Sequence, residues 1–116
     1  MKQHRIKWTL LKNAAKLMLL SEDAITKEYK GVIFAEGNDL YLQTRNQYSN
    51  IIILLGSDKA DKDTFIYAVS ACANILVLLN QCYEKGIITG FNFFRLSIID
   101  NRIGNLLEDL YNKGDN

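Results

Sequence analysis

Nucleophilic and metal-ligating side chains are scarce in this sequence of 116 residues. It contains one histidine, His4, and two cysteines, Cys72 and Cys82. A Ser-His-acid or Cys-His site would require that imidazole, close to a chain end of the kind that usually frays, beside a residue from the middle of the chain. A structural zinc site takes four Cys or His ligands, more than are present. The sequence therefore predicts no catalytic residue, no metal and no cofactor, and we interpret the chain as a non-enzyme.

The two cysteines lie ten residues apart in an apolar segment with helical spacing. Ten helical residues span about 15 Å, whereas the Cα atoms of a disulfide are roughly 4.4–6.8 Å apart. Both are therefore expected to be buried thiols in a reducing compartment. Together with the absence of a signal-peptide pattern in the sequence, this predicts a cytoplasmic location.

Carboxylates cluster once in a predicted loop, at Asp58, Asp61 and Asp63. The cluster lacks the glycine and the final glutamate of a calcium-binding loop, so we interpret it as the solvated entry to a helix. The glycines stand singly and form no phosphate-binding motif, which argues against nucleotide hydrolysis.

Positive charge is concentrated at the N-terminus, although the whole chain carries only +1. The first twenty residues contain five basic residues and no acidic one, with a tryptophan among them. The basic set and the tryptophan are Lys2, Arg5, Lys7, Trp8, Lys12 and Lys16. Three interpretations stay open: a solvated helix face, a contact to nucleic-acid phosphates, and a docking surface for a membrane or an acidic protein.

Residues 5–20 are predicted to form a helix, because their apolar residues recur at spacings of three and four. A strand over residues 4–10 is the alternative. The helix is expected to continue, or to restart at Ser21, through to about Tyr29. The C-terminal segment from Asp100, as N-cap, to Gly114 has the pattern of a short amphipathic helix.

Strand-forming residues dominate the segments between these helices. Residues 32–35 and 40–44 flank the turn-like sequence 36–39 and predict a β-hairpin. The apolar run 51–55, closed by a glycine, predicts a buried strand. Residues 91–99 are predicted as a further strand, with the front half of a longer helix as the alternative.

A long helix over residues 62–85 is the most regular element, with Asp61 or Asp63 as its cap and Gly86 at its end. It carries two apolar rows, and one sheet can cover only one of them. The first row, which we predict to lie in an oligomer interface, consists of Phe65, Val69, Cys72, Leu76, Leu79 and Tyr83. The second row consists of Ala68, Ala71, Ile75, Leu78 and Cys82.

These elements predict one α+β domain over residues 1–116. It would be a small two-layer domain in which an antiparallel sheet of three to four strands packs on the long central helix and on the N- and C-terminal helices. The element order is α-β-β-β-α-β-α. The apolar stretches 51–55 and 71–79 are far shorter than the ~20 residues that span a bilayer, so no membrane span is expected.

The functional prediction is a non-enzymatic binding or regulatory protein that acts as a homo-oligomer, most simply a dimer. It would occupy a protein partner or sequester a ligand. Richness in Lys, Asn and Ile is typical of AT-rich genomes and suggests an inhibitor-type accessory protein of a phage or mobile element. One alternative is nucleic-acid binding through the basic helix. Another is a small-ligand pocket between helix 62–85 and the sheet, with Tyr67, Asn74 and Arg95 as polar anchors.

Overall fold

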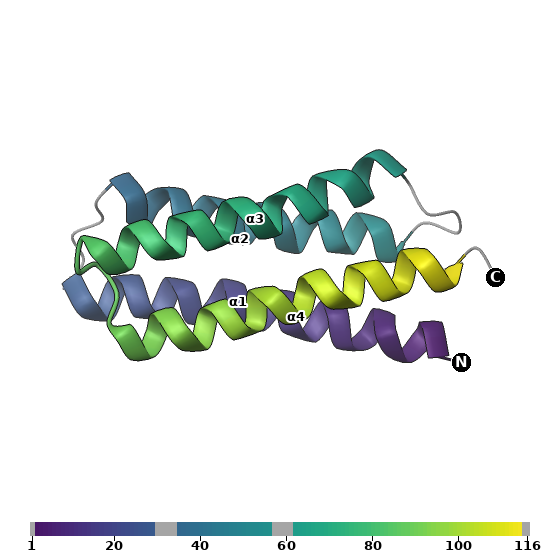
Figure 1. The fold of residues 1–116 in the computed structure, drawn as a ribbon, viewed down its shortest axis with the longest axis horizontal. Coiled ribbons are helices and arrows are strands. Elements are labelled where there is room, and N and C mark those ends of the chain that lie inside the picture. The colour runs from purple at the N-terminus through teal and green to yellow at the C-terminus, as the bar shows by residue number, and fades with distance from the viewer. Residues whose placement is uncertain (1, 30–34, 57–61, 115–116) are drawn as a thin grey trace.

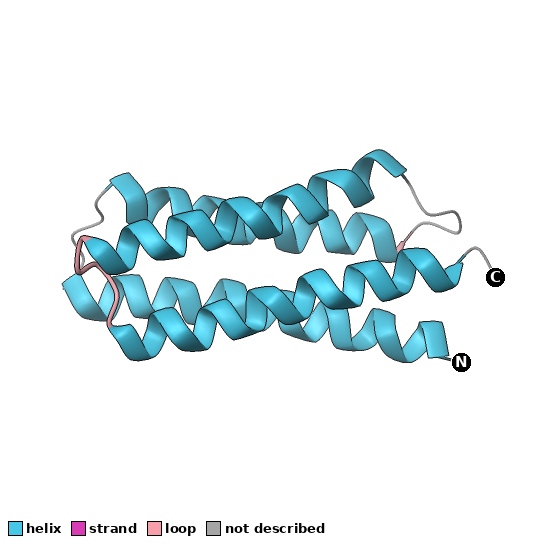
Figure 2. Cartoon of the chain, in the orientation of Figure 1, coloured by secondary structure: helices cyan, strands magenta, loops and turns pink. Residues whose placement is uncertain are grey.

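The chain folds into four long helices, as the computed structural model shows (Figure 1). It describes residues 2–29, 35–56 and 62–114. The helices are α1 (Lys2–Tyr29), α2 (Ala35–Leu55), α3 (Lys62–Glu84) and α4 (Gly90–Gly114). Within the described ranges there is no strand (Figure 2). The prediction of an α+β domain is therefore wrong, and the architecture is a helical bundle.

Each helix packs against two others. α1 contacts α2 and α4, and α3 contacts the same two helices, so that α1 and α3 lie on one diagonal of the bundle and α2 and α4 on the other. Successive helices run in opposite directions along an elongated body of 47 × 22 × 18 Å, and the two chain ends lie at the same end of it (Figure 1). This is the up-down-up-down topology that short connections favour.

The core is a seam of side chains spaced alternately by three and four residues, the repeat that keeps one face of each helix toward its neighbours. On α1 the buried seam is Leu10, Ala14, Leu17, Ser21 and Ala24. On α3 it is Thr64, Ala68, Ala71, Ile75, Leu79 and Cys82. The second apolar row of the central helix therefore faces the core, with Leu79 from the first row beside it.

The predicted hairpin and the predicted strand 51–55 both fall on α2, which contains residues 40–44 and 51–55 and begins with the supposed turn 36–39. Residues 32–34 lie outside the described ranges. The buried positions of α2 are Gly37, Leu40, Thr44, Gln47, Ile51 and Leu54, at spacings of 3, 4, 3, 4 and 3. Two of these six are polar and one is glycine, which hides the helical period from a search for apolar residues.

Residues 91–99 form the first half of α4, so the strand prediction is wrong and the long-helix alternative is confirmed. Asp100 is not a cap but lies inside the helix, only 1% exposed. A charged residue type at a core position breaks the apolar spacing and conceals the helix. The cap is Thr89, whose Oγ1 accepts a hydrogen bond from the backbone N–H of Asn92 at 3.2 Å.

Two helix predictions are confirmed. α1 includes residues 5–20 and continues without a restart through Ser21, whose side chain is fully buried. α3 ends where Gly86 was expected to stop it. Gly86 has φ of 72°, and the N–H groups of Gly86 and Ile87 donate to the carbonyls of Tyr83 (3.0 Å) and Cys82 (2.7 Å), respectively. This pair of bonds is the glycine-terminated helix end known as the Schellman motif. Of the two predicted caps, Asp63 lies in the first turn of α3, and Asp61 lies outside the described residues.

Candidate functional site

The neighbouring helices α3 and α4 each carry exposed, large apolar side chains, and we call eight of them together the apolar face. Its members are between 38 and 71% exposed. They are Ile66, Val69, Leu76, Val77 and Tyr83 on α3, and Phe91, Phe94 and Ile98 on α4. Two stacked ring pairs between the helices, Tyr83–Phe93 and Phe65–Tyr111, have centroid distances of 5.0 and 4.4 Å. The apolar face thus rests on a well-packed pair of helices.

The predicted interface row of α3 is divided between the core and this surface. Leu79 is fully buried, and Phe65 and Cys72 are half-buried beside α4. Val69, Leu76 and Tyr83 remain exposed and belong to the apolar face. Sequence reasoning missed Phe91, Phe94 and Ile98, because the segment that carries them was interpreted as a strand of the core.

No residue of α3 from 64 to 83 is charged. Within the described ranges, α3 is the one helix long and apolar enough to cross a membrane by length and composition. A core helix of a soluble bundle also meets that criterion, so this observation by itself is weak support for a membrane span.

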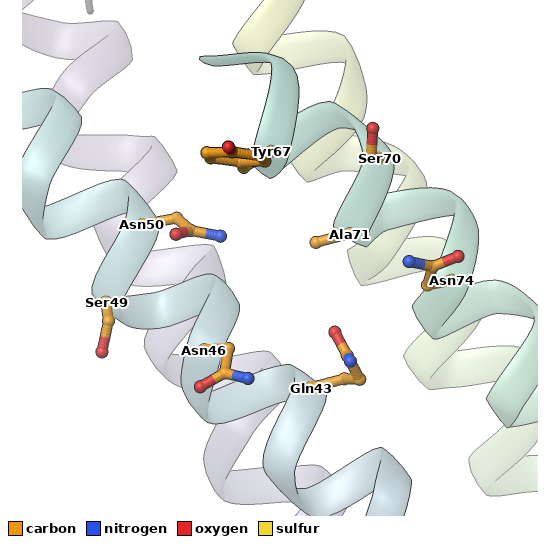
Figure 3. Close-up of a pocket in the computed structure, with 8 residues that line it drawn as sticks. All are labelled: Gln43, Asn46, Ser49, Asn50, Tyr67, Ser70, Ala71 and Asn74. Carbon is orange, nitrogen blue, oxygen red and sulfur yellow. The ribbon is translucent and has the colours of Figure 1, made fainter. Parts of the chain in front are cut away.

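A polar groove of about 350 Å³ lies on the other flank of α3, where it meets α2 (Figure 3). We call it the amide groove. α2 lines it with Gln43, Asn46, Ser49 and Asn50, and α3 lines it with Tyr67, Ser70, Ala71 and Asn74. Figure 3 shows Gln43 and Asn50 leaning toward α3, and Tyr67, Ala71 and Asn74 leaning toward α2. None of these lining side chains is charged.

Beside the lining residues, Gln47 ties α2 to α3. Its side chain is fully buried, and its Nε2 donates to the carbonyl of Ala68 at 2.7 Å and to the Cys72 sulfur at 3.3 Å. Its Oε1 accepts a long bond of 3.5 Å from Asn50 Nδ2. The two walls of the amide groove are therefore held together by a buried side-chain-to-backbone bond.

Two of the three anchors predicted for a ligand pocket, Tyr67 and Asn74, line the amide groove. Arg95 does not line it. It lies on α4, with its guanidinium carbon 5.9 Å from the centre of the Phe91 ring. Sequence reasoning missed the contributions of α2, since it assigned part of this segment to a hairpin. Glutamine and asparagine at 43, 46 and 50 have helical spacing, which was the available signal.

The basic residues of α1 are mostly on its solvent side. Arg5, Lys12 and Lys16 are exposed, and Trp8 is 59% exposed between them. Their spacings of three and four place the four residues on one face, which we call the basic stripe. Lys7 is half-buried, and Lys2 is the first residue of α1.

The reactive residue types give no catalytic arrangement among the described residues. Burial raises the pKa of Cys72 to about 12 and that of Cys82 to about 11, so both thiols stay protonated at neutral pH. His4 is exposed on α1. The described ranges hold no group of three His, Cys, Asp or Glu side chains that could bind a metal ion.

Asp100 has the other strongly shifted side chain. Burial raises its pKa to about 7, and its Oδ1 has no hydrogen-bond partner within the described structure. The carboxyl lies in the core, and Asp100 belongs neither to the apolar face nor to the lining of the amide groove.

Comparison with known proteins gives no relative: no protein-family model, no curated protein and no solved structure matches this chain.

Proposed function

We propose that the chain is a non-enzymatic binding protein that works as a homodimer, with the apolar face of each copy buried against that of the other. The observation that carries the proposal is the number of large apolar side chains that α3 and α4 leave exposed. Single exposed apolar side chains are ordinary on protein surfaces, whereas a large amount of apolar surface marks a site of interaction.

The area of the apolar face fits a dimer. Its eight side chains are between 38 and 71% exposed. If a fully exposed side chain of this size presents about 150–200 Å², together they present roughly 600–800 Å². A standard interface buries about 800 Å² on each partner. The eight apolar side chains alone therefore supply most of that area. The polar residues that normally surround the centre of an interface would add to it.

The charge of the apolar face favours a second copy over an unlike partner. A two-fold interface brings a patch against itself, so a charged patch would meet its own charge. The exposed α3 positions between the apolar residues include Ala73 and Asn80, and α3 has no charge from 64 to 83. The α3 part of the apolar face is therefore uncharged and can be self-complementary, while Arg95 lies against Phe91 in the α4 part.

In this dimer the basic stripe is left free for a further partner. α1 lies diagonally across the bundle from α3 and makes no helix contact with it. Two copies would present two basic stripes, which would favour an acidic protein or another anionic surface through bivalent binding. We propose that the dimer acts by occupying such a partner.

The test is molar mass by light scattering during gel filtration. The proposal expects about twice the 13.3 kDa of one chain at micromolar concentration. Val77→Glu and Phe94→Glu place a charge on exposed positions of the apolar face and should give the mass of one chain with unchanged helical circular dichroism. Ile53→Glu is the matched control, since Ile53 is 54% exposed but lies on α2.

The outcome of these measurements decides the proposal directly. A wild-type protein with the mass of a single chain across the micromolar range would overturn it. So would a dimer that both face variants leave intact.

Nucleic acid is the second candidate for the basic stripe, because Arg5, Lys12 and Lys16 share one exposed face with Trp8. Three cations that neutralise three phosphates would give a salt slope of about −3 on logarithmic axes. Titration of single- and double-stranded oligonucleotides at two salt concentrations, with Lys12→Glu and Lys16→Glu as variants, distinguishes this from a protein partner. Absence of binding at low salt would remove this candidate.

A further inference from the structure

The amide groove offers an unusual set of hydrogen-bonding groups. Four of its eight lining residues carry side-chain carboxamides and three carry hydroxyls, and none is charged. Every one of these groups can both donate and accept a hydrogen bond. A fitting ligand is therefore uncharged and itself carries closely spaced groups that both donate and accept, as vicinal hydroxyls do.

Most of these groups have free hydrogen-bonding capacity. Asn50 alone among the lining residues makes a side-chain hydrogen bond, the 3.5 Å contact to Gln47, within the described structure. The other carboxamides and the hydroxyls of the lining make no side-chain hydrogen bond to the described part of the chain. A ligand would replace water on these groups and would not have to break contacts within the protein.

Tyr67 adds an aromatic surface to these polar groups. Its side chain is 65% exposed and leans over the groove toward α2 (Figure 3). An exposed aromatic ring presents a flat apolar face and a polar hydroxyl edge. The C–H face of a pyranose ring can pack on such a surface, while its equatorial hydroxyls reach the surrounding amides.

The groove is also held in place before any ligand arrives. The side chain of Gln47 on α2 donates a hydrogen bond to the Ala68 carbonyl of α3. Ala71, which is only 6% exposed, is the one lining residue with a small apolar side chain. Because both walls belong to packed helices, binding would order few side chains. Pre-organisation of this kind reduces the entropic cost of binding.

We propose that the amide groove is a binding site for a neutral, hydroxyl-rich small molecule of the carbohydrate class. The volume of about 350 Å³ lies in the lower part of the range for small-molecule sites and suits one or two sugar rings. The site is open and shallow, so the expected dissociation constant for a single ring is on the order of 1 mM.

The test is a titration of the full ¹⁵N-labelled chain followed by amide NMR. The probes are N-acetylglucosamine and maltose, with glucose 6-phosphate as a charged sugar and triglycine as a peptide. The proposal expects saturable shifts of the side-chain amide signals of Gln43, Asn46, Asn50 and Asn74 with at least one neutral sugar. Weaker shifts are expected with glucose 6-phosphate.

Variants locate the binding. Tyr67→Ala and Asn74→Ala should each weaken it at least about fivefold, the effect of one lost packing surface or hydrogen bond. Asn80→Ala is the matched control, because Asn80 is an exposed asparagine of α3 outside the amide groove. It should leave the affinity unchanged.

Several results would overturn the inference. They are no shift with either neutral sugar at concentrations roughly 50-fold above the expected constant, shifts that only triglycine produces, and equal losses in the Asn80→Ala and Asn74→Ala proteins. The titration of Phe94→Glu, a variant on α4, keeps this test separate from the proposed dimer. Its groove is intact, so sugar binding must be retained whether or not the wild type dimerises.

Discussion

The two flanks of α3 differ sharply in chemistry, although residues 64–83 of this helix contain no charge. Toward α2, the exposed residues Tyr67, Ser70 and Asn74 meet amides and hydroxyls across a groove. Toward α4, Val69 and Leu76 belong to the apolar face, which also includes Phe94 on α4. The uncharged part of one helix thus presents two flanks of different chemistry. We assign the apolar flank to self-association and the polar flank to a ligand.

The same contrast continues below the surface. On the α2 side the buried polar residue is Gln47, whose amide donates to α3 at 2.7 Å. On the α4 side it is Asp100, whose Oδ1 has no partner in the described structure. A satisfied buried amide stabilises a helix pair, whereas a buried carboxylate without a full set of partners destabilises the charged form. The buried Gln47 contact between α2 and α3 should thus be insensitive to pH, and the buried Asp100 carboxyl on the α4 side sensitive to it.

The largest predicted effect concerns Asp100. Its pKa is about 7 in the folded protein and 3.8 as an isolated side chain, so the native state binds an additional proton between these pH values. The contribution of Asp100 to stability should be greatest below about pH 4, fall by up to about 1.4 kcal/mol per pH unit as the pH rises toward 7, and then level off. Urea unfolding over this range measures it.

The matching variants separate Asp100 from other carboxyls. Asp100→Asn should flatten this part of the stability profile and raise stability at pH 8 by up to about 4 kcal/mol. Asp109→Asn, at an exposed position on α4, should leave the profile unchanged. A profile that keeps its slope in Asp100→Asn would show that another group is responsible.

The second effect concerns the buried hydrogen bond from Gln47 to the Ala68 carbonyl, beside the amide groove. Gln47→Ala removes a fully buried side chain and its bond to the Ala68 carbonyl, and should destabilise the fold by about 2 kcal/mol. Gln43→Ala, on the same helix but half-exposed at the groove, should change stability by no more than about 0.5 kcal/mol. Equal effects in urea unfolding would remove the distinction between the buried and lining glutamines.

The smallest effect concerns the turn that joins α3 to α4. Gly86 has φ of 72°, a left-handed conformation that disfavours any side chain, so Gly86→Ala should destabilise by about 1–2 kcal/mol. Among the described glycines only Gly86 has positive φ, and Gly56→Ala is the control with little expected change. Thermal unfolding with a larger loss at Gly56 would contradict this assignment of the helix end.

Helices whose apolar residues recur at regular spacing could be predicted from the sequence. Helices with polar residues at core positions could not. Helices over 5–20 and 62–85 were predicted correctly because the apolar residues there recur at spacings of three and four. α2 and the first half of α4, residues 91–99, were predicted as strands, and Thr44, Gln47 and Asp100 occupy core positions in these two helices and interrupt the apolar period. Strand propensity in 51–55 then outweighed the pattern, although packing context commonly overrides propensity.

The candidate surfaces depended on those assignments. The excess of apolar residues on α3 could be recognised from its two apolar rows. The exposed apolar residues of α4 could not be recognised, because residues 91–99 were predicted as a strand. Tyr67 and Asn74 were recognised as polar anchors on α3. The residues of α2 that line the groove opposite them could be found only once the packing of α2 against α3 was known. A single sequence does not give that packing.

The central claim is that the apolar face joins two copies of the chain. Isotope-filtered NMR on an equimolar mixture of ¹³C-labelled and unlabelled protein measures contacts between copies and no others. The account predicts intermolecular NOEs from Val77 and Leu76 to aromatic protons such as those of Phe94. Intermolecular NOEs confined to α1 and α2, or none at a concentration where the mass is that of a dimer, would contradict it.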